Sequence, residues 1–179
     1  MKGSVISAIK NRRSIRNWVN QDIPDELLNN VIEAARWAPS SCNRQSVKLK
    51  IVKEKELREL VTNVSSGGKG FANLAPVLIV LLSDLSVYNL PYERNLAYVD
   101  AALAAQNLML QAYEEGLGTC YLNWALPVPE ADEILYEKLD IPNRMLIVGV
   151  IPIGIPDESI EFETSQRKPF REFLIQDGE

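Results

Sequence analysis

The sequence contains no histidine, and this absence excludes several kinds of catalytic site at once. A Ser-His-Asp triad, a Cys-His dyad and any zinc or non-haem iron site with a histidine ligand are impossible in such a chain. Cysteine is scarce as well, since Cys42 and Cys120 stand far apart and outside any spaced metal or redox pair. We therefore expect two free thiols and no iron–sulfur cluster held by one chain. Redox chemistry, if the protein performs any, must come from a bound organic cofactor.

Long apolar runs are also missing, because no run approaches the roughly 20 residues that a membrane span requires. The start of the chain does not continue into the apolar core of a signal peptide. No Gly-x-Gly-x-x-Gly follows a strand and no phosphate loop ends in Gly-Lys-Ser/Thr, so a standard dinucleotide or NTP site is not expected. The net charge of −5 argues against a general nucleic-acid surface. We expect a cytoplasmic protein that binds neither membrane nor nucleic acid.

Two stretches near the start carry the strongest chemical signal. Arg-Arg-Ser-Ile-Arg at 12–16 crowds three guanidinium groups into five residues, against the acidic balance of the whole chain. Planar, permanently charged donors of this kind suit a phosphate. Ala-Pro-Ser-Ser-Cys-Asn-Arg-Gln at 38–45 is a turn of short polar side chains that can hydrogen-bond the edge of a polar ring. A phosphate at one end and a polar ring at the other indicate a flavin nucleotide.

Each stretch also has a structural alternative. Arginines at a helix end often cap carbonyl groups or pair with surface carboxylates, and serines after a proline often form only a turn. The joint pattern, not either stretch alone, favours a binding site.

The apolar periodicity predicts helices interspersed with a few strands. Helices are expected at 4–11, 24–39, 54–64, 95–115 and 129–139, and strands at 47–51, 77–82, 119–123 and 145–154. The strand at 47–51 should be half-exposed, whereas the run at 77–82 is typical of a strand buried on both faces. The helix at 95–115 is apolar almost all round and so belongs in a core or a subunit interface. The simplest architecture is an α+β sandwich in one domain.

The chain resembles the nitroreductase family of FMN-dependent oxidoreductases over nearly its whole length. The stretches at 12–16 and 38–45, the helix from Asp100 to Gly118, and Arg-Lys-Pro at 167–169 carry the resemblance in the right order. The resemblance implies a single domain over 1–179, built as a three-layer α/β/α sandwich with a mostly antiparallel sheet and a long interface helix. It also implies a homodimer, in which a tail from about residue 155 extends onto the partner subunit.

The same resemblance places FMN at the subunit interface. It implies that Arg12 and Ser14 hold the phosphate, that Arg13 contributes through its backbone, and that Arg167 closes over the phosphate from the tail. Arg16 would face the pyrimidine side of the ring, where a cation stabilises negative charge on the reduced flavin. The residues implied at the ring are Pro39, Ser40, Ser41 and Asn43, partly from the other subunit, together with the backbone near Asn123 and the neighbouring Trp124.

The activity implied is transfer of hydride from NADH or NADPH through flavin N5 to a small acceptor such as a nitroaromatic or a quinone. No side chain need act as a catalyst, and protons can come from water or from a hydroxyl such as that of Tyr88, Tyr92 or Tyr121. Two alternatives stay open. One is a flavin-dependent dehydrogenase or tailoring oxidase of a specific metabolite, and the other is a non-catalytic flavin-binding protein whose pocket is closed by Trp124.

Three departures from the family pattern bear on the substrate more than on the flavin. Ser46 stands where many relatives have proline, and Asn123-Trp124 stands where glycine is common. The connection from Leu82 to Asn95 is brief, although longer members carry pocket-shaping helices there.

Overall fold

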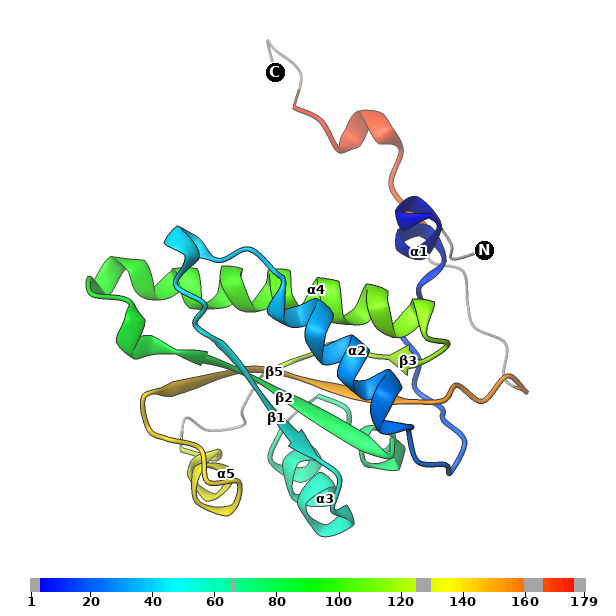
Figure 1. Ribbon diagram of the computed structural model, residues 1–179, viewed down its shortest axis with the longest axis horizontal. Helices are drawn as coiled ribbons and strands as arrows, with labels where there is room; N and C mark the ends of the chain where they lie inside the picture. Colours follow the sequence, from blue (N-terminus) through cyan, green and yellow to red (C-terminus); the bar gives the residue numbers. More distant parts are fainter. Residues whose placement is uncertain (1–3, 66, 125–129, 160–165, 176–179) are drawn as a thin grey trace.

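The computed structural model describes residues 4–65, 67–124, 130–159 and 166–175, and it arranges them in three layers (Figure 1). The middle layer is a sheet in which every described strand pair is antiparallel, with the order β1-β2-β5-β3 and with β4 also paired to β5. The strands are β1 (Val47–Val52), β2 (Val77–Asp84), β3 (Gly118–Thr119), β4 (Leu122–Asn123) and β5 (Met145–Gly154).

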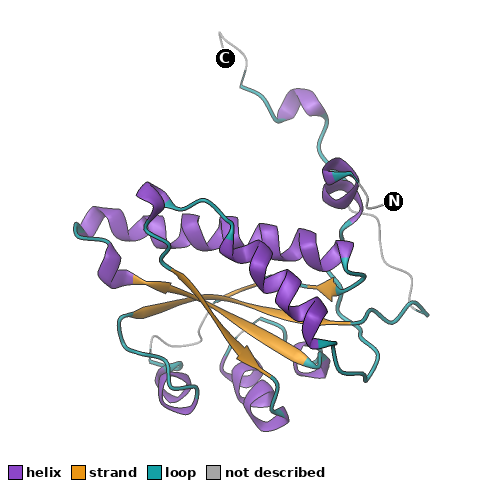
Figure 2. Cartoon of the chain, in the orientation of Figure 1, coloured by secondary structure: helices purple, strands orange, loops and turns teal. Residues whose placement is uncertain are grey.

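Helices cover both faces of this sheet, as the cartoon shows (Figure 2). One outer layer holds α2 (Asp25–Arg36) and the long α4 (Leu96–Glu114), and the other holds α3 (Lys55–Val64) and α5 (Glu133–Lys138). The short α1 (Val5–Asn11) packs at the C-terminal end of α4. Each sheet face has its own apolar core cluster. The expected three-layer α/β/α sandwich with a mostly antiparallel sheet is confirmed.

Short 3₁₀ segments link these elements. They span Ser41–Asn43, Ala72–Leu74, Leu85–Val87, Pro91–Asn95 and Phe170–Glu172. Residue 129, where a helix was expected to begin, lies outside the described residues; residues 130–132 form a turn, and α5 begins only at Glu133.

The burial of the strands follows their side-chain patterns. Every residue of β2 is buried, because its unbroken apolar run packs on both helical layers. β1 lies at the edge of the sheet and is only partly buried, with Lys48 exposed. Both expectations are confirmed.

The strand expected at 119–123 is divided into β3 and β4, although both face β5 in one continuous register. At the gap, the Cys120 N–H donates to the Pro152 carbonyl at 3.3 Å. Pro152 has no N–H with which to return a second bond. The expected strand is therefore one ladder interrupted opposite a proline.

The long helix α4 buries one side and exposes apolar groups on another. Its small residues pack on α2 and the sheet, whereas Tyr98, Val99 and Leu103 are exposed. Among the described residues, no helix is long and apolar enough to cross a membrane. The expectation that α4 serves as a core or interface helix is consistent with this two-sided character.

Candidate functional site

The arginine-rich segment at 12–16 is fixed beside β3 by its backbone. The Ile15 N–H donates to the Thr119 carbonyl at 2.9 Å, and Ser14 pairs with Thr119 as a parallel bridge. Gly118 permits this approach, because a Cβ at that position would lie 2.7–2.8 Å from three side-chain atoms of Ile15. The backbone bond to Thr119 and the close packing at Gly118 therefore hold the segment without using the Arg12 guanidinium.

Those guanidinium groups form a cluster of like charge. Burial lowers the pKa of Arg12, and the charges of Arg13 and, further along the chain, Arg167 lower that pKa further. The Arg13 guanidinium donates to the carbonyls of Lys10 and Arg12, at 2.7 and 2.9 Å. None of the ion pairs found in the described part of the chain includes Arg12, Arg13 or Arg167. The cluster has the charge and the donors to bind a phosphate.

Arg16, two residues after Ser14, contacts an aromatic side chain. Its guanidinium carbon is 5.8 Å from the ring centroid of Phe71, and Phe71 in turn stacks on Trp18 at 6.4 Å. The aromatic contact orients a charged group that is otherwise exposed.

Cys120 is a buried free thiol next to Ser14, between the charges of Arg12 and Arg16. Burial raises its pKa, and the two arginines oppose that rise without reversing it. The thiol is therefore protonated at neutral pH. Cys42 is also free, so the expectation of two free thiols is confirmed.

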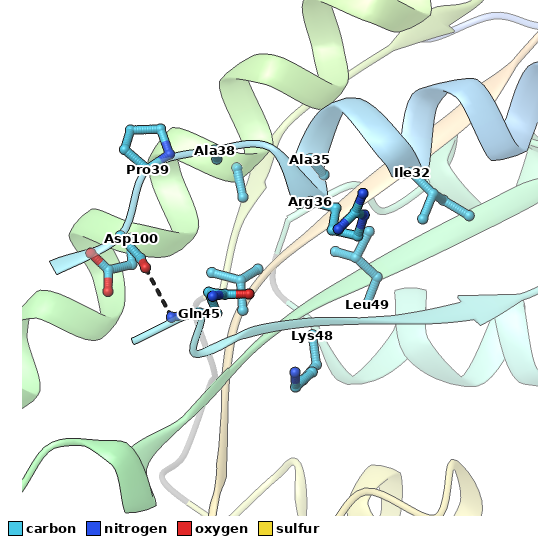
Figure 3. A pocket seen from close by; sticks show the side chains of 12 residues that line it. Ile32, Ala35, Arg36, Ala38, Pro39, Gln45, Lys48, Leu49 and Asp100 are labelled. Carbon is cyan, nitrogen blue, oxygen red and sulfur yellow. Dashed lines mark hydrogen bonds between the residues drawn. The ribbon is translucent and has the colours of Figure 1, made fainter. Parts of the chain in front are cut away.

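The polar loop at 38–45 has a strained backbone. Cys42, Asn43 and Gln45 have φ values of 53°, 54° and 51°, a left-handed conformation that side chains other than glycine disfavour. The Gln45 N–H donates to Ser40 Oγ at 2.9 Å, the bond drawn dashed in Figure 3. Arg44 pairs with Glu93 at 2.8 Å. The loop is thus held in one shape by its own side chains.

A buried carboxylate that no sequence motif singled out lies beneath this loop. Asp100 of α4 is 1% exposed, and its Oδ1 accepts from the Ser41 N–H and from Ser41 Oγ, both at 2.9 Å. Its Oδ2 accepts from the Tyr88 hydroxyl at 2.8 Å. Ser41 therefore points inward. The available signal was a lone carboxylate inside an otherwise apolar stretch of helix.

A cavity of about 310 Å³ opens behind the loop, between α2, β1 and α4 (Figure 3). Apolar side chains form most of its wall, and the loop contributes Pro39 and Ser40. None of the residues at 12–16 lines this cavity.

The two motifs lie at opposite ends of α4 (Figure 1). Ser41 is bonded to Asp100 near the start of the helix, whereas Ser14 is beside Thr119, just past its end. A helix of 19 residues is about 28 Å long. One chain therefore brings Arg12, Arg13, Ser14 and Arg167 together, but it does not bring them to Pro39, Ser40 and Asn43.

The sequence matches the model of the nitroreductase family over residues 9–69 and 63–155. The chain belongs to the nitroreductase family. The family resemblance found in its sequence is confirmed.

Individual relatives match this nitroreductase-family chain over most of its length. An NADH dehydrogenase of Thermus thermophilus is 31% identical to it, over 94% of this chain and 94% of the relative. An FMN reductase (NAD(P)H) of Bacillus subtilis is 28% identical over 85% of this chain and 66% of its own length. Among solved structures, an FMN-dependent nitroreductase from Clostridium difficile superposes with a TM-score of 0.80 at 26% identity, covering 97% of this chain and 99% of the other.

Residues 123 and 124, where this chain differs from the usual nitroreductase pattern, lie in different environments. Asn123 ends β4 and is exposed, whereas Trp124 is half-buried against the core cluster that α3 and α5 cover. The Trp124 Nε1 atom is buried and finds no hydrogen-bond partner within the described ranges. The Trp124 indole thus packs into a core cluster.

Proposed function

We propose that this protein is an FMN-dependent oxidoreductase that takes electrons from NADH or NADPH and delivers them to a small acceptor such as a nitroaromatic or a quinone. The observation that carries the proposal is the cluster of Arg12, Arg13 and Arg167. Like charges crowd there with no carboxylate partner in the described part of the chain, so a dianionic phosphate would relieve their repulsion. The FMN reductase of Bacillus subtilis and the FMN-dependent nitroreductase of Clostridium difficile support this cofactor.

The residues present fit such a cofactor at both of its ends. Arg12, Ser14 and Arg167 would bind the phosphate, and Arg13 would contribute through its backbone. Arg16, oriented on Phe71, would place positive charge at the pyrimidine side of the ring. The backbone N–H near Asn123 would orient the ring edge. When bound, FMN supplies the electron-transfer chemistry, and the protein supplies binding, orientation and charge.

We further propose a homodimer, because the ring-facing loop residues Pro39, Ser40 and Asn43 lie at the opposite end of α4 from the phosphate-facing arginines. A two-fold axis across the exposed face formed by Tyr98, Val99 and Leu103 would bring the loop of one chain to the arginines of the other. The tail from about residue 155 would extend onto the partner. In its described part, Phe170 and Phe173 are 77% and 83% exposed on the single chain, and a partner would cover them.

We place this protein in a reducing compartment, the cytoplasm. Cys42 and Cys120 are both free thiols, as is usual where thiols are kept reduced.

The test is an anaerobic titration of the purified protein with NADH and NADPH, followed by visible absorbance. We expect the protein to bind FMN, the flavin band to bleach with a reduced nicotinamide, and the colour to return when a quinone or nitroaromatic is added. Flavin that stays oxidised under both nicotinamides would contradict the oxidoreductase. If the protein binds no added FMN, the proposal that FMN is its cofactor is wrong.

A further inference from the structure

The buried carboxylate of Asp100 is satisfied entirely by neutral donors. Its three hydrogen bonds come from the Ser41 N–H, the Ser41 hydroxyl and the Tyr88 hydroxyl. No ion pair found among the described residues includes it. A buried carboxylate without a cation is costly unless its oxygens accept several bonds. The fold therefore keeps Asp100 only as long as Ser41 and Tyr88 remain in place.

The hydroxyl groups beside Asp100 form a row in which each donates its hydrogen toward the carboxylate. Tyr88 has one hydroxyl hydrogen but two oxygen neighbours at 2.8 Å, Asp100 Oδ2 and Ser46 Oγ. Because Tyr88 donates this one hydrogen to Asp100 Oδ2, Tyr88 accepts from Ser46. Ser46 in turn accepts from Ser83 at 3.2 Å. Asp100 thus ends a row of buried hydroxyls and joins that row to the loop through Ser41.

The loop above this row needs an anchor. Cys42, Asn43 and Gln45 hold left-handed backbone angles that cost free energy for non-glycine residues. Such a conformation persists only where the surroundings over-determine it. The two bonds from Ser41 to Asp100 fix the loop from the inside, while Pro39 and Asn43 remain exposed on the outside.

We propose that Asp100, through Ser41 and with Tyr88 as its second support, is a positioning residue that sets the ring-facing surface of the loop. This inference rests on the proposed function, in which that surface faces the flavin ring. Asp100 itself touches no part of the cofactor. Its role is to make the loop rigid before the ring arrives, which lowers the ordering cost of binding. Ser46 extends the support, because its hydroxyl joins Tyr88 to Ser83.

The experiment compares Tyr88→Phe with Tyr136→Phe in the full-length protein. Both changes remove one tyrosine hydroxyl that donates a hydrogen bond inside the fold, since Tyr136 donates to the Met145 carbonyl at 3.0 Å on the other face of the sheet. We expect Tyr88→Phe to raise the dissociation constant of FMN roughly tenfold, because the loop loses one of its supports and more of its ordering then occurs on binding. We also expect it to shift the midpoint potential of the bound flavin, which Tyr136→Phe should leave unchanged.

A second pair repeats the comparison with a smaller change. Ser41→Ala removes one donor to Asp100, and Ser86→Ala removes the matching donor to Asp84, where the N–H and hydroxyl of one serine also share a carboxylate oxygen. If Tyr88→Phe does not fold, the comparison of Ser41→Ala with Ser86→Ala tests the positioning role of Asp100 instead. We expect weaker FMN binding and faster amide exchange over 39–45 in Ser41→Ala alone.

The outcomes separate the two proposals. Wild-type protein that binds no FMN overturns the proposed function. Wild-type protein that binds FMN, with equal affinity and equal potential in Tyr88→Phe and Tyr136→Phe, overturns the positioning role of Asp100 and leaves the function standing.

Discussion

The segment at 12–16 and the loop at 38–45 are both rich in polar residues, but they are held in place in different ways. In the first, the backbone is held by the bond from Ile15 to Thr119 and by close packing at Gly118, so the Arg12 guanidinium is not needed to hold it. In the second, the side chains are used to hold the backbone: Ser40 bonds Gln45, and Ser41 bonds Asp100. The segment at 12–16 thus supplies positive charge for binding, whereas the loop at 38–45 supplies a surface of fixed shape. Each can be altered without the other.

The largest expected effect comes from filling the space that Gly118 leaves for Ile15. Gly118→Ala places a Cβ 2.7–2.8 Å from the branched carbon atoms of Ile15, where little can yield. Overpacking of this kind costs about 1–3 kcal/mol, and we expect a clear fall in Tm together with loss of FMN affinity. Gly67→Ala is the control, since its Cβ would meet only ordinary contacts at 3.6–3.8 Å. Equal Tm values for the two variants would show that 12–16 is not held by this packing.

Removing Arg12 should separate binding from stability. Arg12→Ala is expected to weaken FMN binding by about 1.5–3 kcal/mol, roughly ten- to hundredfold in Kd. The apoprotein should not lose stability and is expected to gain some, because the charges of Arg13 and Arg167 crowd Arg12. FMN titration and thermal unfolding of the apoprotein measure the two effects. Lys55→Ala, an exposed lysine on α3, removes the same charge elsewhere and should leave FMN affinity intact. Unchanged FMN affinity in Arg12→Ala would contradict the phosphate assignment.

The smallest expected effect concerns the exposed turn that leads into the loop. Glu33 accepts bonds from Arg36 and from the Trp37 indole, at 2.5–2.7 Å, and these bonds lower its pKa from 4.5 to about 2. Because the folded pKa is depressed, the stabilisation is present above pH 4.5 and is lost as the pH falls toward 2. The bonds are exposed, so the contribution is small and is reduced by salt.

Thermal unfolding of wild-type apoprotein and Glu33→Gln between neutral and acid pH measures this contribution. We expect the wild type to be slightly more stable at neutral pH and the difference to vanish in acid. A difference that persists or grows on acidification would contradict the assignment of this stabilisation to the Glu33 carboxylate.

The fold was largely readable from the sequence because its signals are long and regular. The unbroken apolar run at 145–154 matches β5 over its full length. The sequence at 119–123 predicts one strand. The interruption between β3 and β4 is not visible there, because it arises from Pro152, a residue of the partner strand β5. A proline contributes no signal to a segment some thirty positions away until the pairing is known.

The site was readable only in part. The arginines at 12–16 stand together in sequence, so their shared chemistry is visible before folding. The charge of Arg167 acts on this group from the tail, and only the family resemblance indicates it. Asp100 gave almost no signal, because its partners Ser41 and Tyr88 come from separate connections that meet only in the folded chain. The departure at Ser46 reads as a mild change until its hydroxyl is seen between Tyr88 and Ser83.

The crowding of Arg12, Arg13 and Arg167 ties the lifetime of the protein to the supply of its cofactor. A ligand that binds only the folded state stabilises that state by about 2.7 kcal/mol when its concentration is a hundred times Kd. On the proposed function, FMN supplies this stabilisation and neutralises the repulsion at the same time. In a cell short of flavin, the unfolded fraction rises and proteases remove it. Flavin scarcity then lowers the number of protein molecules as well as the activity of each.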